Sequence, residues 1–328
     1  MVEAARKAIT EHFKRTSVKV ELIHQPGNHW RARYALPLPI PLVSLIIPTR
    51  NGLTYLDRCV ESILKKTSYP NFEIIVADNG SDDAETCAYL QKITKPASIH
   101  TSDGRTIVVR VLSCPGAFNY SAINNNAVHE ARGEFVALLN NDLEVITSDW
   151  LEELVSHAAR PGIGCVGPML YYPNNTLQHA GVVLGIAGHA GHAFKGLKRG
   201  TPGYMNHARL VKNYSAVTGA CLVVRKSTYE QVGGLDAANL AISLNDVDFC
   251  LKVHAAGYLN LWTPFAELYH HESATRGYED SPEKMARFAR EREVLRQRWL
   301  TLLERDPAYN PNLSLETENF ALAYPPRL

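Results

Sequence analysis

The chain has 328 residues, of which 45% are hydrophobic and 20% are charged. This composition supports a sizeable core in one large α/β domain or two smaller ones, and it excludes disorder as the default state. Because 34 basic residues balance 33 acidic ones to a formal net charge of +1, bulk charge gives no reason to expect nucleic acid or an anionic membrane surface as a partner.

Two further features of the sequence concern its compartment. The six cysteines are scattered without a CxxC pair, which favours reduced thiols over a zinc ribbon or a disulfide framework. The N-terminus has no apolar signal segment, and no stretch approaches the length needed to span a bilayer. We therefore expect a soluble, cytoplasmic protein.

The first 41 residues form a predicted appendage. Residues 2–15 have a helical pattern, and the alternating segments 18–23 and 30–34 flank a Pro-Gly-Asn turn, which predicts a hairpin. Residues 37–41 contain three prolines, which remove backbone donors and predict an extended linker. We expect the main domain to cover residues 42–280, with residues 281–328 forming a C-terminal helix and tail that pack on it.

From residue 42 onward, strand-like and helix-like segments alternate. The predicted strands cover residues 42–47, 72–77, 107–112 and 134–139, and the predicted helices cover 55–65, 83–93 and 121–130. This alternation is typical of a parallel sheet covered by helices, and near-continuous apolar strands indicate that both sheet faces are buried. Ligands of such sheets bind beyond the carboxyl ends of the strands.

Three loops are predicted to open at that edge of the sheet. Thr49 and Arg50 follow the first strand and are suited to phosphate oxygens, whereas Asp78 and Asn79 follow the second and are suited to a base or ribose. The alternative is that these are ordinary rim, turn and helix-cap residues. The absence of GxxxxGK[ST] and GxGxxG argues against a P-loop NTPase and a dinucleotide-binding dehydrogenase.

The third loop begins where the apolar run 135–139 ends in Asn140, Asn141 and Asp142. A carboxylate at the end of a buried strand is well placed for Mg²⁺ or Mn²⁺, which often bridge protein carboxylates and nucleotide phosphates. Asn and Asp also end strands simply because they favour turns. The residues alone leave both interpretations open.

Several ordered motifs together resemble the family 2 glycosyltransferases of the GT-A fold. They lie at residues 44–52, 76–83, 131–134, 139–142, 218–221, 232–236, 245–252 and 269–273. The resemblance covers about residues 42 to 275 and implies a mostly parallel nucleotide-binding sheet flanked by helices. It also assigns roles, implying that the donor nucleotide is held by Pro48, Thr49, Arg50, Asp78, Asn79 and Asn141.

The resemblance further implies a metal site that holds Mn²⁺ or Mg²⁺. Asp142 matches the direct metal ligand of the family's Asp-x-Asp motif, but Asn140 occupies its first position; one charge fewer should weaken cation binding without abolishing it. His270 is similar to a second ligand, and an imidazole favours Mn²⁺ over Mg²⁺. The alternative for His270 is a loop or core contact. Arg276 is expected to close over the diphosphate.

Asp246 matches the catalytic aspartate of the family's Glu-Asp motif, where a carboxylate takes the proton of the acceptor hydroxyl. The alternative is that Asn245 caps a helix and that Asp246 and Asp248 interact favourably with the positive end of its dipole.

Residues 173–212 are rich in Gly and His, and we expect a mobile acceptor-site loop there in preference to a zinc site. Leu295 replaces the Gln of the Gln-x-x-Arg-Trp motif of processive synthases, so processivity is not inferred.

The sequence thus predicts an inverting, metal-dependent glycosyltransferase. Resemblance to rhamnosyltransferase-type members implies dTDP-rhamnose or a UDP-hexose as donor, and a bacterial surface glycan such as O-antigen, free or lipid-linked, as acceptor. The chain also resembles a module of a longer transferase, either free in the cytoplasm or held at the inner membrane through other domains. The alternatives are an inactive nucleotide- or glycan-binding module and a sugar nucleotidyltransferase, although the latter's Gly-rich activating loop is missing.

Overall fold

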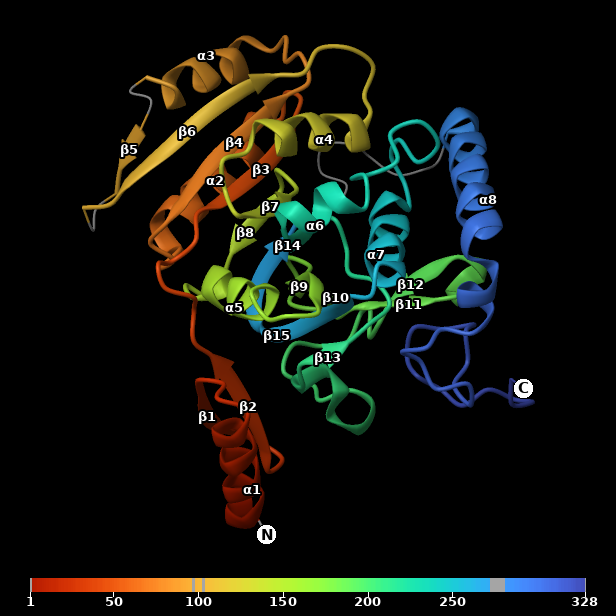
Figure 1. The fold of residues 1–328 in the computed structure, drawn as a ribbon. Coiled ribbons are helices and arrows are strands. Elements are labelled where there is room, and N and C mark those ends of the chain that lie inside the picture. The colour runs from red at the N-terminus through yellow and green to blue at the C-terminus, as the bar shows by residue number, and fades with distance from the viewer. Residues whose placement is uncertain (1, 96–97, 102–103, 272–280, 328) are drawn as a thin grey trace.

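A large curved sheet forms the centre of the computed structural model, which describes residues 2–95, 98–101, 104–271 and 281–327 (Figure 1). Within these ranges eleven strands join in this sheet, nine of them in the order β13-β15-β9-β14-β7-β3-β4-β6-β5. The remaining two strands also belong to this sheet: β10 pairs with β9, and β8 pairs with β15. The mixed α/β class predicted from the sequence is therefore confirmed.

One half of the sheet is parallel and matches the predicted alternation of strands and helices. Its strands are β3 (Val43–Thr49), β4 (Phe72–Asp78), β6 (Thr106–Ser113) and β7 (Phe135–Leu139), and β5 (Ser98–His100) adds antiparallel to β6. Strand β3 pairs in parallel with both β4 and β7. The carboxyl ends of these strands consequently meet at one edge, as the sequence predicts.

The other half of the sheet is mostly antiparallel, and it contributes residues to the same edge. It contains β8 (Leu143–Val145), β9 (Ile163–Tyr171), β10 (Leu177–His179), β13 (Lys212–Asn213), β14 (Cys221–Arg225) and β15 (Leu259–His270). Strand β14 runs antiparallel to β7, with Cys221 opposite Leu139. Strand β15 runs antiparallel to β8, with His270 opposite Leu143. This register carries His270 to the loop that follows β7.

Helices cover both faces of the sheet, because the strands are apolar on both faces. Helices α2 (Leu53–Lys66), α3 (Ala84–Ile93) and α5 (Trp150–Ala158) bury residues in one core, and α4 (Tyr120–Glu130), α6 (Lys226–Gln231), α7 (Asn245–Ala255) and α8 (Pro282–Glu304) contribute to the other. Adjacent strand residues alternate between these cores: Leu45 and Ile47 belong to the first, Ile46 to the second. No described helix has the length and apolarity needed to cross a membrane.

Side-chain caps fix where several helices begin. Asp83 accepts a hydrogen bond from the Thr86 backbone N–H at 2.9 Å at the start of α3, and Asn119 accepts one from Ala122 N–H at 2.9 Å at the start of α4. Helix α7 has no such cap. Its N-cap residue, Leu244, has a φ of 60°, a left-handed conformation that residues other than glycine rarely adopt.

The Gly- and His-rich segment has more regular structure than the loop predicted from the sequence. Besides β10, it contains β11 (Val182–Leu184), η1 (Ile186–Gly188), β12 (Ala190–His192) and η2 (Tyr204–Arg209). Strands β11 and β12 pair antiparallel as a separate two-stranded sheet. Short strands separated by glycines give little periodic signal, which explains why sequence patterns alone miss them.

The N-terminal appendage consists of α1 (Val2–Arg15), β1 (Val20–Gln25) and β2 (His29–Tyr34), and it projects from the sheet domain (Figure 1). Arg31 of β2 donates to Glu153 Oε2 of α5 at 2.5 Å. The other Glu153 oxygen lies 3.1 Å from His157 Nε2 and accepts a 2.7 Å hydrogen bond from Thr263 Oγ1. A buried carboxylate with every oxygen paired thus joins the appendage to the domain.

Candidate active site

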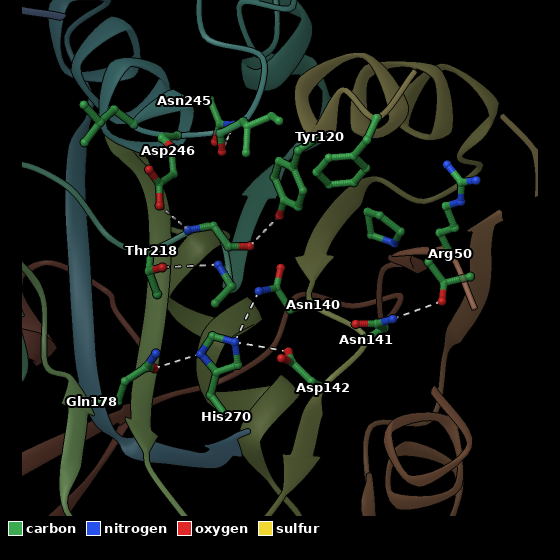
Figure 2. Close-up of a pocket in the computed structure, with 18 of the residues that line it drawn as sticks. Arg50, Tyr120, Asn140, Asn141, Asp142, Gln178, Thr218, Asn245, Asp246 and His270 are labelled. Carbon is green, nitrogen blue, oxygen red and sulfur yellow. Dashed lines mark hydrogen bonds and ion pairs between the residues drawn. The ribbon is translucent and has the colours of Figure 1, made fainter. Parts of the chain in front are cut away.

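A cavity of about 570 Å³ lies at the carboxyl edge of the parallel strands. Its walls come from the loops after β3 and β7, from α4, β10 and β12, from the turn before β14, from the start of α7 and from the end of β15. They consist of Pro48, Thr49, Arg50, Phe118, Tyr120, Asn140, Asn141, Asp142, Gln178, His192, Thr218, Gly219, Ala220, Ile242, Ser243, Leu244, Asn245, Asp246 and His270. Both halves of the sheet therefore contribute to one site (Figure 2).

Most of the residues proposed from the sequence line this cavity. They are Pro48, Thr49, Arg50, Asn141, Asp142, Asp246 and His270. Asn141 Nδ2 donates to Thr49 Oγ1 at 3.0 Å, which ties the β7 loop to the end of β3. The Arg50 guanidinium lies at the rim, 3.9 Å from Asp82, and half of its side chain is exposed. An exposed cation at this edge is available to an anionic ligand.

Asp78 and Asn79 do not line the cavity, and their side chains have partners within the chain. Asp78 Oδ1 accepts from Ser81 Oγ at 2.5 Å and from Ser81 N–H at 3.1 Å. Asn79 is buried and donates to the carbonyl oxygens of Cys114 and Gly116. These contacts agree with the alternative that both residues stabilise a turn, although Asn79 Oδ1 is buried without a hydrogen bond. Arg276 lies outside the described residues.

The centre of the site is the pair formed by Asp142 and His270. His270 Nε2 lies 3.1 Å from Asp142 Oδ1, and both side chains are 6% exposed. The Asp142 oxygen is nevertheless buried without a hydrogen bond of good geometry. A buried carboxylate oxygen left unpaired is costly, so its presence in a cavity wall points to a ligand.

The spacing of the pair is compatible with a divalent cation. In an octahedral shell with bonds of about 2.1 Å, neighbouring ligand atoms lie about 3.0 Å apart, close to the 3.1 Å between His270 Nε2 and Asp142 Oδ1. A carboxylate and an imidazole suit Mn²⁺. Among the described residues no group of three His, Cys, Asp or Glu side chains converges, so a cation held here would need its remaining ligands from phosphates or water.

Asp246 lies on the other side of the cavity, in the first turn of α7 (Figure 2). Its carboxylate accepts from Gly219 N–H at 2.8 Å and from Val247 N–H at 2.9 Å. Burial raises the pKa of Asp246 above its ordinary value of 3.8, although these backbone hydrogen bonds oppose the shift. A side chain at position 219 would place its Cβ 3.2 Å from Asp246 Cβ, so glycine permits this close contact.

Comparison with known proteins identifies the family. Residues 44–233 match the profile of glycosyl transferase family 2. The chain belongs to this family. It is 36% identical over 98% of its length to the O-antigen biosynthesis protein RfbC of Myxococcus xanthus, of which it covers 24%. It is 52% identical to protein y4gI of Sinorhizobium fredii, of which it covers 35%. The chain thus spans about a third or less of these longer relatives.

Other relatives and solved structures agree with this assignment. The N-acetylglucosaminyl-diphospho-decaprenol L-rhamnosyltransferase of Mycobacterium tuberculosis is 27% identical over 68% of the chain and 74% of the relative. The structure of GalNAc-T7 with UDP, GalNAc and Mn²⁺ has a TM-score of 0.59 at 16% identity, covering 88% of this chain and 56% of that one. The mannosyltransferase PcManGT of Pyrobaculum calidifontis, in complex with GDP-Man and Mn²⁺, has a TM-score of 0.53 at 17% identity, covering 93% and 79%. Both likenesses show the GT-A fold.

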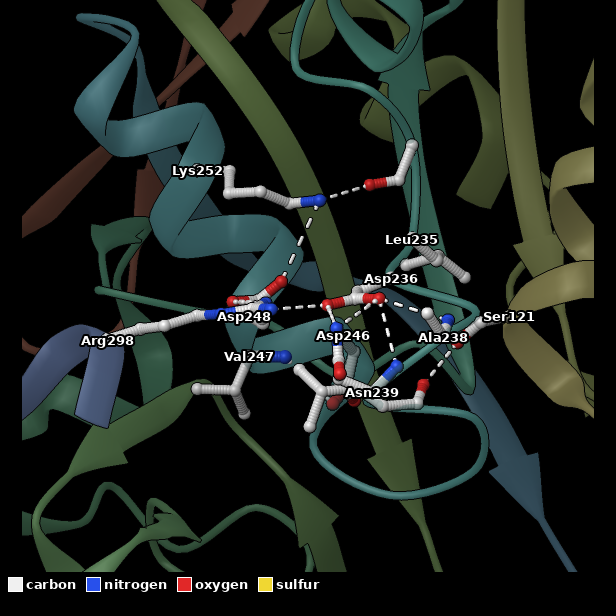
Figure 3. A network of polar contacts seen from close by, with 12 residues as sticks. Ser121, Leu235, Asp236, Ala238, Asn239, Asp246, Val247, Asp248, Lys252 and Arg298 are labelled. Carbon is white, nitrogen blue, oxygen red and sulfur yellow. Dashed lines mark hydrogen bonds and ion pairs between the residues drawn. The ribbon is translucent and has the colours of Figure 1, made fainter. Parts of the chain in front are cut away.

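In this family 2 glycosyltransferase, α8 holds the loop that precedes Asp246. The Glu291 carboxylate accepts from Ile242 N–H at 2.9 Å and from Ser243 N–H at 3.1 Å, and Glu291 is buried. About two turns further along α8, Arg298 donates to Asp248 of α7 and to Asp236 (Figure 3). Trp299 also donates to Asp248. These contacts stabilise the strained conformation at Leu244. Arg298 and Trp299 therefore join α8 to α7. Their match to the Arg-Trp part of the processive-synthase motif does not reveal this role.

Several cavity residues of this glycosyltransferase received no individual role from the sequence, among them Tyr120, Gln178 and His192. Tyr120 donates through its hydroxyl to Gly219 O at 2.8 Å. His192 Nδ1 lies 2.9 Å from Nδ1 of His179, which burial and His192 keep uncharged by lowering the pKa of His179 well below 6.5. The run of polar residues at 178–179, set in an apolar and glycine-rich context, is the signal that could have found Gln178.

Proposed function

We propose that this chain is an inverting, metal-dependent glycosyltransferase that moves a sugar from a nucleoside diphosphate to a hydroxyl group of a bacterial surface glycan. The observation that supports it best is that one cavity has the unpaired Asp142 oxygen beside His270 on one side and Asp246 on the other. The first pair suits a cation on a diphosphate, and the second carboxylate suits a proton acceptor.

In this proposal Asp142 and His270 hold the cation, and Thr49, Arg50 and Asn141 contact the donor nucleotide. The cation, when bound, supplies a Lewis acid that offsets charge on the leaving diphosphate. Mn²⁺ in the structures of GalNAc-T7 and PcManGT and the affinity of imidazole for Mn²⁺ support manganese, with Mg²⁺ as the alternative.

Asp246 acts as the base. The acceptor oxygen forms a bond to the anomeric carbon from the face opposite the diphosphate, the bond to the diphosphate oxygen breaks, and the Asp246 carboxylate takes the hydroxyl proton. Inversion at the anomeric carbon follows from this single displacement. Because burial raises the pKa of Asp246, its carboxylate is a better proton acceptor than an exposed aspartate would be.

The donor and acceptor are inferred from relatives. The relative of Myxococcus xanthus acts in O-antigen biosynthesis and that of Mycobacterium tuberculosis is a rhamnosyltransferase, which supports dTDP-rhamnose first and a UDP-hexose second. The acceptor would be a glycan or a lipid-linked glycan. The proposed location is the cytoplasm. In a longer protein such as the relatives of which the chain covers 24–35%, other domains would hold it at the cytoplasmic face of the inner membrane.

A panel of nucleotide sugars, incubated with and without Mn²⁺, tests the proposal through nucleotide release. Asp246→Asn is expected to lower turnover by about 10²–10⁴-fold while nucleotide and Mn²⁺ affinities, measured by calorimetry, stay close to wild type. The matched control is Asp57→Asn, which changes an exposed carboxylate of α2 and should leave turnover unchanged. Full turnover in Asp246→Asn would contradict the assigned base.

One observation favours a second candidate, a catalytically inactive nucleotide-binding module. Asn140 stands where the family motif has a carboxylate, and its Nδ2 lies 3.2 Å from His270 Nε2, at a nitrogen that would otherwise bind a cation. Calorimetry separates the two candidates. Nucleotide affinity that does not respond to Mn²⁺ or Mg²⁺, with no turnover of any donor, would favour the inactive module.

A further inference from the structure

Gln178 of β10 contacts the proposed metal ligand His270 from the side away from Asp142 (Figure 2). Its Oε1 lies 2.9 Å from His270 Nδ1, and the Gln178 side chain is buried. The proposed function uses His270 but gives Gln178 no role. The contact therefore raises the question of which His270 nitrogen carries the proton.

The Gln178 contact places that proton on Nδ1. An amide oxygen only accepts hydrogen bonds, so a 2.9 Å contact to Nδ1 requires that Nδ1 donates. A neutral imidazole with its proton on Nδ1 has a lone pair on Nε2. That lone pair is the atom that a metal would bind.

Asn140 gives the same answer from the other side of the ring. Its Nδ2 lies 3.2 Å from His270 Nε2, and an amide nitrogen only donates. A proton on Nε2 would set two donors against each other, whereas a lone pair accepts the Asn140 hydrogen bond. Two amides, one in β10 and one in the loop after β7, thus require the same tautomer.

The Asp142 oxygen lies close to the same ring nitrogen. Its Oδ1 lies 3.1 Å from His270 Nε2 but accepts no hydrogen bond of good geometry. The Nε2 atom is thus directed toward Asn140 and not toward this oxygen. A cation that took the place of the Asn140 hydrogen bond at Nε2 would have the Asp142 oxygen within reach as a second ligand.

We propose that Gln178 is a positioning residue, which holds His270 in the Nδ1–H tautomer so that the Nε2 lone pair and Asp142 are preorganised for a divalent cation. The inference rests on the proposed metal dependence. A partner that fixes the tautomer and ring orientation of a ligating histidine also increases its basicity, and loss of such partners lowers metal affinity by about 10–100-fold.

The test compares Gln178→Met, which removes the acceptor at similar volume, with Gln178→Glu, which retains one. In metal-free protein labelled with ¹⁵N-histidine, the ring ¹⁵N shifts report the tautomer at a pH of about 8, where free imidazole is neutral; His270→Asn identifies the signal. We expect the Nδ1–H form in the wild type and in Gln178→Glu, and a shift toward the Nε2–H form in Gln178→Met.

Mn²⁺ affinity, measured by electron paramagnetic resonance titration, is the second readout. Gln178→Met should weaken Mn²⁺ binding by about 10–100-fold, and Gln178→Glu should restore it. The matched control is Gln297→Met on the exposed side of α8, which should change neither measurement. Thermal unfolding of each variant separates these effects from loss of fold.

Two results would overturn the proposal: an Nε2–H tautomer in the metal-free wild type, or an unchanged tautomer and Mn²⁺ affinity in Gln178→Met. Failure of the proposed function looks different. Suppose that the wild type shows the Gln178-dependent tautomer but neither binds Mn²⁺ nor turns over a donor. Gln178 would then still position His270, but the proposed metal-dependent transfer would be wrong.

Discussion

In the described part of the chain, two buried carboxylate–histidine pairs have the same separation and opposite surroundings. Asp142 and His270 lie 3.1 Å apart at the cavity, and Glu153 and His157 lie 3.1 Å apart beneath the N-terminal appendage. Glu153 is saturated by Arg31 and Thr263, whereas Asp142 retains an unpaired oxygen. Distance and burial therefore do not distinguish a structural pair from a ligand site, but completeness of hydrogen bonding does.

The electrostatics of the structural pair reflect that saturation. Burial acts to raise the pKa of Glu153, but the hydrogen bond and charge of His157, together with Arg31 and Thr263, lower it to about 2. Glu153 is thus ionised, and its charge is fully paired. The comparison predicts that substitutions at Asp142 and His270 affect function, whereas substitutions at Glu153 and His157 affect stability.

The largest expected effect is that of Asp142→Ala on donor turnover. Loss of the carboxylate should remove Mn²⁺ affinity and several kcal/mol of transition-state stabilisation, or about 10³–10⁴-fold in kcat/KM. Because Asp142 Oδ1 is unpaired, the free energy of unfolding without metal should not fall. Calorimetry and urea unfolding measure the two quantities, and a strongly destabilised variant with normal Mn²⁺ binding would break the comparison.

Glu153→Gln should have the reverse effect. Removing the charge leaves Arg31, whose side chain is only 13% exposed, beside a neutral amide, and breaking such a pair costs about 3–5 kcal/mol of unfolding free energy. Mn²⁺ affinity and turnover should be retained at temperatures where the variant is folded. Asp149→Asn is the matched control, since Asp149 is 34% exposed and 3.9 Å from Arg31, and it should cost less than about 1 kcal/mol.

The stability of the protein should also depend on pH through Glu153. A folded-state pKa of about 2 for Glu153, below the ordinary 4.5, contributes stability that is complete above pH 4.5 and is lost as the pH falls toward 2. About 2.5 pKa units correspond to about 3 kcal/mol. The difference in unfolding free energy between wild type and Glu153→Gln should shrink by about this amount over that range, and a constant difference would contradict the pairing.

The smallest expected effect is that of Asn140→Asp, which restores the family's motif. A further carboxylate beside Asp142 should tighten Mn²⁺ binding by roughly 1 kcal/mol, or about fivefold. It also removes the amide that occupies His270 Nε2 in the metal-free state. Asn174→Asp, at an exposed turn, controls for net charge. Weaker Mn²⁺ binding in Asn140→Asp would show that the amide is needed at the site.

Sequence patterns predict the parallel half of the sheet well because its signals are local. Apolar runs and intervening amphipathic segments place β3, β4, β6 and β7 within about two residues of their observed bounds. The antiparallel half is not predicted strand by strand. Its strands β8 and β10 have three residues each, too few to show a period, and β8 pairs with residues far along the chain.

The same distinction applies to the site. Motifs place Asp142, His270 and Asp246 in one region, and the structure brings all three to one cavity. Gln178 could not be assigned in this way, because its contact with His270 depends on how β10 and β15 both pair with β9. Asp78 shows the opposite case, since its hydrogen bonds to Ser81 are a local turn that a motif match alone does not reveal.

The pairing of β8 with β15 also has a consequence for folding. Asn140 and His270 are 130 residues apart in the chain, and a pairing of three residues holds the end of β15 against β8. Non-local strand pairing forms slowly, because the entropy of closing the long loop must be overcome first. If Asp142 and His270 hold a cation as proposed, that cation would stabilise the sheet only after this pairing has formed, by a free energy that rises with the logarithm of the cation concentration.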